Sequence, residues 1–240
     1  MNAAWIKQAA DEVIARLRAC KDRDRHAATA NYYPSAQENL GVYAADIRAV
    51  VRDFKRLLKN ESARDVITLA HAIIARNTME GRQVAYETIM HHKPAREALT
   101  CKELEKLGRG IDNWASVDVF ACGLSGPAWR EGRITDTDVQ RWARSKDPWW
   151  RRAAVVSTVP LNTASKGGKG DTRRSLLICE MAVGDDHIMV HKALSWALRQ
   201  LAGFDRNAVE GFLKRHGESL PALVRREVGN KLRSGRKSGK

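Results

Sequence analysis

The chain is a succession of amphipathic helical segments separated by short breaks, from near its first residue to near its last. Apolar residues recur at spacings of three and four, and no run shows the alternating pattern of a strand. Glycine, asparagine and proline residues lie between the segments. The pattern predicts an all-α protein with helices near residues 4–18, 43–59, 62–76, 79–92, 95–107, 111–124, 135–145, 148–160, 171–183, 187–202, 205–216 and 220–233.

The predicted helices form pairs that recur about every 35–40 residues, which is the range of HEAT and armadillo repeats. In such repeats, antiparallel helix pairs stack into a solenoid. We therefore expect one HEAT-like helical-repeat domain over residues 1–233, with a concave basic groove. Residues 234–240 are basic and of low complexity, and they predict a disordered tail.

The charge of the chain indicates its class of partner. Lysine and arginine number 42 against 28 acidic residues, which gives a net charge of +14. Such an excess favours a polyanion. We expect nucleic acid rather than a membrane, because no long apolar span or lipidation motif occurs. The N-terminal residues lack the features of a signal peptide, so we expect a cytoplasmic, nucleoid-associated protein.

The cysteines and histidines give little support for a metal site. No Cys-x-x-Cys occurs, so we expect buried free thiols in a reducing compartment. His187 and His191 are four residues apart, with Asp185 and Asp186 just upstream, but the H-E-x-x-H pattern is absent. A metal site is therefore not expected from these residues. The cysteines are Cys20, Cys101, Cys122 and Cys179.

An acidic residue interrupts an apolar stripe in Asn-Trp-Ala-Ser-Val-Asp, residues 113–118. One helix face would carry Trp114, Val117, Asp118 and Ala121. An ionised aspartate is costly to bury without a partner. We therefore expect Asp118 either to pair with a buried cation or to face a cleft in which its charge is used.

Arg152 interrupts a second stripe, in Asp-Pro-Trp-Trp-Arg-Arg-Ala-Ala, residues 147–154. Pro148 is expected to be the first helical residue. The stripe then consists of Trp149, Arg152, Ala153, Val156 and Pro160. On these residues alone two interpretations stay open, a structural Asp118–Arg152 ion pair and a functional site.

A tryptophan lies off the core stripe of segment 187–201. Trp196 is about 100° from Ala197, and Lys192 and Arg199 share its face. An exposed tryptophan between two cations suits contact with phosphates and with a sugar or base. The alternative is that Trp196 packs on a neighbouring helix while the two cations are solvated. The core stripe consists of Val190, Ala193, Leu194, Ala197, Leu198 and Leu201.

Three segments together resemble the AlkD-like family of bacterial DNA alkylation repair proteins, which are alkylpurine DNA glycosylases built from HEAT-like repeats. Residues 113–118 resemble its Trp-x-x-x-Asp segment, and residues 149–154 resemble its Trp-x-x-Arg-Ala-Ala segment. Residues 192–199 resemble its Lys-Ala-Ile-Gly-Trp-x-Leu-Arg segment. Their order and approximate spacing also agree, and the resemblance spans essentially the whole chain.

The resemblance implies hydrolysis of the N-glycosidic bond of cationic N3- or N7-alkylated purines in duplex DNA, without a deep base-flipping pocket. It implies that Asp118 stabilises the sugar cation and positions water, and that the monomeric protein needs no cofactor or metal. Catalytic roles are implied for Asp118, Trp114 and Trp196, and DNA-binding roles for Arg152, Arg199 and Lys192.

Two alternatives share parts of this pattern. A noncatalytic HEAT-like protein that binds bent, damaged or branched duplex DNA would have the same positive charge. A helical protein–protein scaffold would have the same repeats. Neither requires a carboxylate such as Asp118 in a DNA-facing groove, so this residue favours the glycosylase.

Overall fold

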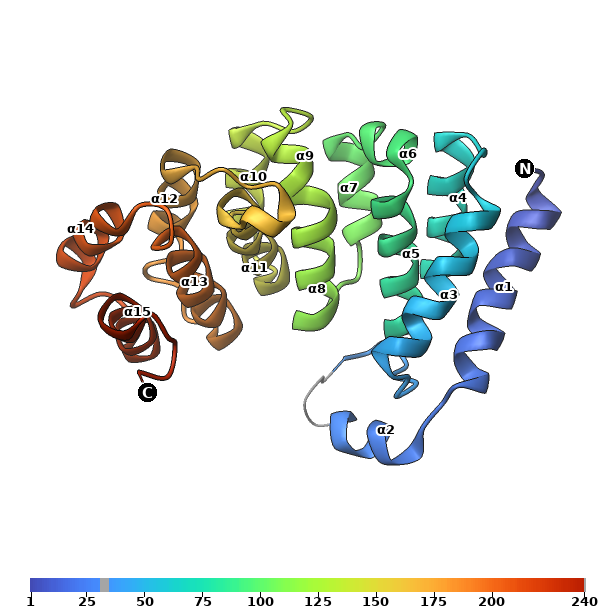
Figure 1. Cartoon of the computed structure of the whole chain (residues 1–240), viewed down its shortest axis with the longest axis horizontal. Coiled ribbons are helices and arrows are strands. Elements are labelled where there is room, and N and C mark those ends of the chain that lie inside the picture. The colour runs from blue at the N-terminus through green and yellow to red at the C-terminus, as the bar shows by residue number, and fades with distance from the viewer. Residues whose placement is uncertain (31–34, 240) are drawn as a thin grey trace. The chain divides into compact units, whose positions relative to one another are not determined.

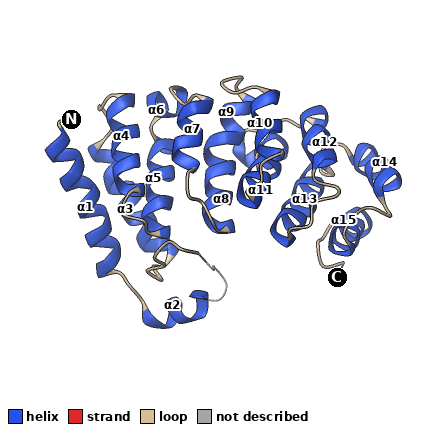
Figure 2. Cartoon of the chain, turned by 180° about the vertical axis from the view of Figure 1, so that it is seen from behind, coloured by secondary structure: helices blue, strands red, loops and turns tan. Residues whose placement is uncertain are grey.

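The computed structural model of the protein describes residues 1–30 and 35–239. The chain divides into two compact units, Met1–Leu124 and Ser125–Lys240, which we describe one at a time. Within the described ranges the regular structure is helical, and Figure 2 contains no strand. An isolated bridge joins Glu38 and Thr78. The all-α prediction is confirmed, and helices that neighbour one another in sequence pack together as in a helical repeat.

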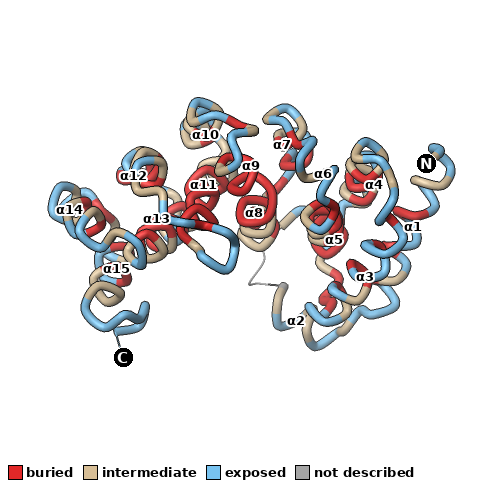
Figure 3. The backbone as a smooth tube through the Cα atoms, turned by 45° about the horizontal axis from the view of Figure 1, so that its top comes forward, coloured by how far each residue is buried: buried red, intermediate tan, exposed pale blue. Residues whose placement is uncertain are grey.

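Helix α5 is the centre of the first unit (Figure 1). It packs against α3, α4 and α8, and α1 packs against α4. Burial extends over most of the length of α5 (Figure 3). The helices of this unit are α1 (Ala3–Ala19), α2 (Arg23–Ala30), α3 (Ala44–Leu57), α4 (Ala63–Ile74), α5 (Met79–His91), α6 (Lys93–Glu97), α7 (Cys101–Gly108) and α8 (Trp114–Phe120).

Helix α13 has the corresponding place in the second unit, where it contacts α11, α12 and α15. The predicted core stripe of this helix is confirmed, since all of its residues are buried. A π-helical turn, Ala121–Ser125, precedes this unit. The helices of the second unit are α9 (Gly126–Arg130), α10 (Asp136–Ala143), α11 (Pro148–Val156), α12 (Thr172–Met181), α13 (Ile188–Leu201), α14 (Arg206–His216) and α15 (Ala222–Ser234). Two 3-10 turns, Val159–Asn162 and Ala164–Lys166, lie between α11 and α12.

Helix α2 was not among the predicted helices, because its sequence lacks an apolar stripe. Its start is held by polar contacts: the Arg25 amide donates to Asp22 Oδ1 at 2.7 Å. Gly41 lies close to this turn with a φ of +70°, and a Cβ there would lie 2.7 Å from the His26 amide nitrogen. This polar helix is therefore held by close backbone approach and by polar side chains, since Arg25 Nε also donates to the Val42 carbonyl at 3.1 Å.

Two of the predicted helices have other boundaries in the structure. The predicted helix 95–107 is two helices, because Thr100 accepts a hydrogen bond from the Glu103 amide and starts α7. The predicted helix 148–160 begins at Pro148 as expected, but α11 ends at Val156. Pro160 lies in the following 3-10 turn, where its missing N–H is tolerated.

The glycine-rich segment 162–170 and the C-terminal residues belong to the second unit and contact its helices. Arg130 Nη1 donates to the Lys166 carbonyl at 2.7 Å. In the tail, Lys237 Nζ lies 3.1 Å from Glu227 Oε1. The predicted domain boundary at residue 233 stays a prediction. In the described part of the chain, no helix is both long and apolar enough to cross a membrane.

The cysteines differ in exposure, which corrects the expectation that all are buried. Cys20 is exposed, and Cys101 is half-buried. Cys122 and Cys179 are buried, and burial raises the pKa of the Cys179 thiol far above its ordinary value. Among the described residues the four cysteines form no disulfide.

A buried arginine joins α5 to the segment that leads into α8. Arg82 is 4% exposed, and its Nε donates to Gln37 Oε1 at 3.1 Å. Its Nη1 donates to the Tyr86 hydroxyl and to the Leu107 and Arg109 carbonyls at 3.0 to 3.2 Å. A planar guanidinium presents several donors in fixed directions, so one side chain satisfies acceptors from three segments at once.

Replacement of Arg82 by glutamine should therefore destabilise the fold. Arg82→Gln leaves several buried acceptors without a donor, which we expect to lower the free energy of unfolding by about 2–4 kcal/mol. Urea denaturation measures the change. Arg109→Gln is the matched control, because the exposed Arg109 contributes its carbonyl rather than its side chain, and it should change stability by less than about 0.5 kcal/mol. Equal stability of the two variants would contradict the role of Arg82.

Candidate active site

The predicted catalytic aspartate lies on α8, whose start is fixed by a buried cap. Asn113 is 1% exposed, and its Oδ1 accepts from the Ser116 amide at 2.9 Å. This hydrogen bond satisfies one of the amide groups that a helix start leaves without a partner. Trp114 is consequently the first residue of the helix.

The preceding residue, Asp112, ties the start of α8 to the segment around Gln37. Asp112 accepts hydrogen bonds from the Ser35 hydroxyl, the Ala36 amide and Gln37 Nε2. Burial works against its charge, but these donors lower the pKa of the carboxyl group below its ordinary value. Because Gln37 also accepts from Arg82, one polar network runs from the first turn of α5 to the first turn of α8.

Trp114 and Asp118 lie one turn apart on the same side of α8. Val117 and Ala121 are fully buried, as the predicted stripe requires, whereas Trp114 and Asp118 are half-buried. Asp118 therefore stands at the edge of the apolar stripe and is only partly covered. A half-buried site of this kind strengthens electrostatic interactions while leaving access for a ligand.

The turn that follows Asp118 is a π-helix, Ala121–Ser125. Such turns are rare, and they often lie next to functional residues. Gly123 in this turn approaches Met90 of α5, and a Cβ at Gly123 would lie 2.2 Å from the Met90 sulfur. The close approach holds the end of α8 against the central helix of the unit.

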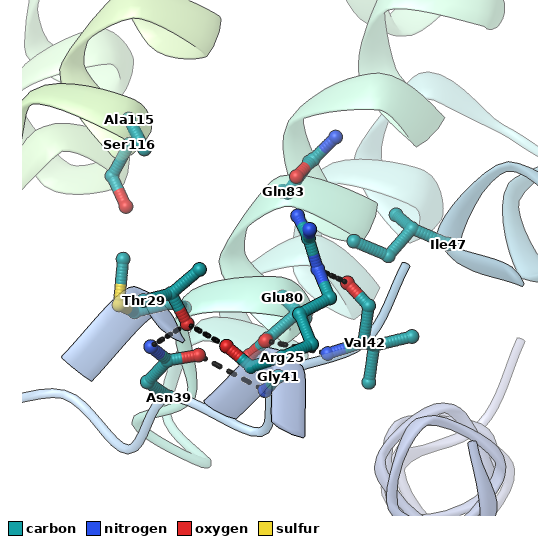
Figure 4. Close-up of a pocket in the computed structure, with 11 residues that line it drawn as sticks. Arg25, Thr29, Asn39, Gly41, Val42, Ile47, Glu80, Gln83, Ala115 and Ser116 are labelled. Carbon is teal, nitrogen blue, oxygen red and sulfur yellow. Dashed lines mark hydrogen bonds between the residues drawn. The ribbon is translucent and has the colours of Figure 1, made fainter. Parts of the chain in front are cut away.

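A small pocket of about 80 Å³ lies beside the first turn of α8 (Figure 4). The Glu80 carboxylate on one side of the pocket accepts hydrogen bonds from the Leu40 and Val42 amides. Ala115 and Ser116 lie on another side. Ligand sites commonly exceed about 300 Å³. This pocket is therefore too small to be assigned as a substrate site.

In the second unit, Arg152 connects α11 to α13. It is 4% exposed, and its Nη1 donates to the Met189 carbonyl at 2.5 Å. Met189 belongs to the first turn of α13, so this hydrogen bond joins the helix of one predicted motif to the helix of the next. The predicted DNA-contacting arginine thus also has a structural role.

The neighbouring arginine holds the segment in front of α13. Arg151 donates to both carboxylate oxygens of Asp185, at 2.6 and 3.1 Å. Burial opposes the charge of Asp185, but Arg151 lowers the pKa of its carboxyl group. His191 Nε2 bonds to the Asp185 carbonyl, and His187 caps α13. These histidines have structural partners, and the described residues contain no group of three or more His, Cys, Asp or Glu side chains arranged to hold a metal ion.

The two cations predicted to flank Trp196 have different environments. Trp196 is half-buried and Lys192 is exposed. The Arg199 side chain is 16% exposed and lies 3.8 Å from Glu227 of α15. Its Nε donates to Ser195 Oγ, which in turn donates to Glu227 Oε2 at 2.6 Å. Burial lowers the pKa of Arg199, and Glu227 opposes that shift.

Each unit brings together part of the predicted set. The first unit holds Trp114 and Asp118 on one face of α8, and the second packs α11, with Arg152, against α13, with Trp196. The sequence analysis missed Ser195 and Glu227. A serine four residues before Arg199, on the same side of the helix, was the available signal.

These features define a helical-repeat protein with a strong positive charge and with a carboxylate and a tryptophan at the edge of a buried helix face. A family model described as DNA alkylation repair enzyme matches residues 13–232. The chain belongs to this family, so the resemblance given by its three motifs is confirmed. A search of curated proteins finds no match to the chain. Membership assigns the protein to the repair of alkylated DNA, with DNA as its partner.

The buried Glu227 should make stability depend on pH. Burial works against its charge, but hydrogen bonds from Ser195 and Lys237 lower the pKa of Glu227 below its ordinary value of 4.5. Its ionised form therefore stabilises the fold at neutral pH, and this contribution is lost as the pH falls through the lowered value. We expect Glu227→Gln to reduce the free energy of unfolding at pH 7 by about 1–2 kcal/mol and to flatten its pH dependence in acid.

Denaturation curves measured between neutral and acid pH test this expectation. Glu218→Gln is the control, because Glu218 is exposed. If the free energy of unfolding of Glu227→Gln falls with decreasing pH just as that of the wild type does, Glu227 does not contribute in this way.

Proposed function

We propose that the protein is a DNA glycosylase that hydrolyses the N-glycosidic bond of cationic N3- or N7-alkylated purines in duplex DNA. The observation that carries the proposal is the pair Trp114 and Asp118, half-buried on one side of a helix whose start is fixed by a buried polar network. Family membership supports action on alkylated DNA. The glycosylase chemistry is our inference from the side chains.

The charge of the lesion decides what the protein has to supply. Alkylation at N3 or N7 makes the purine cationic, so the base departs with the electron pair of the C1′–N bond and becomes neutral. The deoxyribose then develops oxocarbenium character. Water attacks C1′, releases a proton, and leaves an abasic site. Catalysis therefore requires stabilisation of the sugar cation and positioning of one water molecule.

Asp118 is suited to both tasks. A carboxylate stabilises a developing positive charge, and it can orient a water molecule and accept its proton. Trp114, one turn away, presents an aromatic face, which attracts a cationic sugar or base. The cationic purine is already a good leaving group, so the proposal needs no acid to protonate it and no deep base pocket.

The second unit would supply contacts to the duplex. Lys192 is exposed and suits a phosphate, while Trp196 would provide a second aromatic contact. Arg152 and Arg199 are proposed to contact the backbone in addition to their partners within the protein. We propose that one copy of the chain is sufficient for this binding.

A single-turnover assay of base release tests the proposal. We expect wild-type protein to release 3- or 7-alkylated purine from duplex DNA. Asp118→Asn should lower the rate by roughly 10²–10⁴-fold, because the amide cannot stabilise the cation or accept a proton. Duplex affinity should stay within about threefold, since the carboxylate does not attract phosphate.

Asp24→Asn, in the exposed part of α2, is the matched control and should keep wild-type activity. An alkylated duplex that stays intact through long incubation with excess wild-type protein, despite tight binding, would favour the noncatalytic DNA-binding alternative. Equal rates for Asp118→Asn and wild type would exclude Asp118 as the catalytic group.

The different environments of Lys192 and Arg199 give a further prediction. Lys192→Gln should weaken duplex binding and reduce the slope of log affinity against log salt by about one, with unchanged stability. Arg199→Gln should also lower the midpoint of thermal unfolding, because it leaves Glu227 with fewer partners. Fluorescence anisotropy at several salt concentrations and thermal melts separate the two effects. A salt slope unchanged by Lys192→Gln would exclude a phosphate contact there.

A further inference from the structure

A pocket of about 490 Å³ lies in the first unit, away from the α8 residues assigned to catalysis. It is bounded by the C-terminal part of α3, the end of α5 and the start of α6. In Figure 1, α3 and α6 both lie beside α5. We call it the α3–α5 pocket. The residues used below are Arg52, Lys55, Lys59, Thr88, His92 and Lys93, all of which line it.

Two buried polar side chains of this pocket have an unsatisfied hydrogen-bonding atom. Thr88 is 2% exposed and His92 is 7% exposed. Neither Thr88 Oγ1 nor His92 Nε2 has a hydrogen-bond partner in the described chain. The two residues are four apart at the end of α5, so they lie on the same side. Buried polar atoms are normally paired, and an unpaired one costs about 1–3 kcal/mol.

The other ring nitrogen of His92 fixes what Nε2 can do. His92 Nδ1 accepts a hydrogen bond from the Ala95 amide at 3.1 Å and thereby caps α6. In a neutral imidazole one nitrogen accepts and the other carries the hydrogen. Nε2 is therefore a donor, and a bound partner at this position must offer an acceptor.

The charges around the pocket indicate which acceptor fits. Arg52, Lys55 and Lys59 approach from α3 and the turn after it, and Lys93 approaches from the start of α6. None of the described residues that line the pocket is acidic. Lys93 lies 3.8 Å from Glu97, outside the lining, and this exposed pair is weak. Two buried donors surrounded by cations favour an anion with several oxygen atoms.

We propose that the α3–α5 pocket binds a phosphate group, with His92 Nε2–H and Thr88 Oγ–H donating to its oxygens and the surrounding lysines and arginine neutralising its charge. A phosphodiester of the DNA backbone is the source that the chemistry favours. This choice of source rests on the DNA binding in the proposed function. A free phosphate would use the same donors.

Titration of inorganic phosphate into the full chain, followed by NMR of the histidine ring signals, tests the site directly. We expect the His92 ring to shift with saturable dependence on phosphate. Thr88→Val removes one donor at constant shape and should weaken binding by roughly tenfold. Thr137→Val, in an exposed turn of α10, is the matched control and should leave the affinity unchanged.

Two further variants separate the contribution of the His92 hydrogen-bond donor to phosphate binding from that of the surrounding positive charge. His92→Asn keeps a residue that caps helices well but cannot place its amide where Nε2 lies, so it should weaken phosphate binding to a similar degree. Lys55→Gln should weaken it through charge, whereas Lys102→Gln, exposed on α7 and outside the pocket, should not. Thermal melts of each variant verify that the fold is retained.

Competition with unmodified duplex DNA distinguishes the two sources. If the pocket takes a backbone phosphate, the duplex displaces inorganic phosphate, and Lys55→Gln lowers the salt slope of duplex binding by about one. If the pocket takes free phosphate, it stays occupied when the duplex binds. A His92 ring that does not respond to phosphate, or equal affinity in Thr88→Val and wild type, overturns the proposal.

These measurements use unmodified DNA and inorganic phosphate, so they do not depend on base release. Absence of glycosylase activity with normal phosphate binding would count against the proposed function alone. Normal base release with an unresponsive His92 would count against this pocket alone.

Discussion

The hydrogen bonds of Arg82 are the interaction on which the first unit depends. This guanidinium, buried in the first turn of α5, donates to Gln37 and to the Leu107 and Arg109 carbonyls at the end of α7. Gln37 in turn binds Asp112, and Asn113 caps α8. The position of the proposed catalytic carboxylate is therefore set by polar groups at the start of its helix as well as by the apolar packing of Val117 and Phe120.

The second unit uses arginines in a similar way. Arg151 and Arg152 are consecutive in one motif, and each donates to the segment that starts α13. The same short motif therefore sets the packing of two helices and carries a predicted DNA contact.

The sequence predicted the helices with strong apolar stripes, and the core stripe of α13 is buried as expected. It did not predict α2, whose residues are polar and whose packing relies on the glycine at position 41. The split between α6 and α7 depends on Thr100, and capping hydrogen bonds are not visible in hydrophobic periodicity. Trp114 and Asp118 were found because a charge breaks a stripe. Glu227 and His92 were not, because their roles depend on contacts between helices distant in sequence.

The burial of Cys179 has a consequence for a protein that repairs alkylation damage. Alkylating electrophiles in the cell react with thiolates as well as with DNA bases, and a thiol reacts only to the extent that it ionises. Cys179 is buried with a raised pKa, so the core of the second unit resists self-inactivation. Cys20 is exposed at the end of α1, and adduct formation there would leave α8 and its carboxylate untouched.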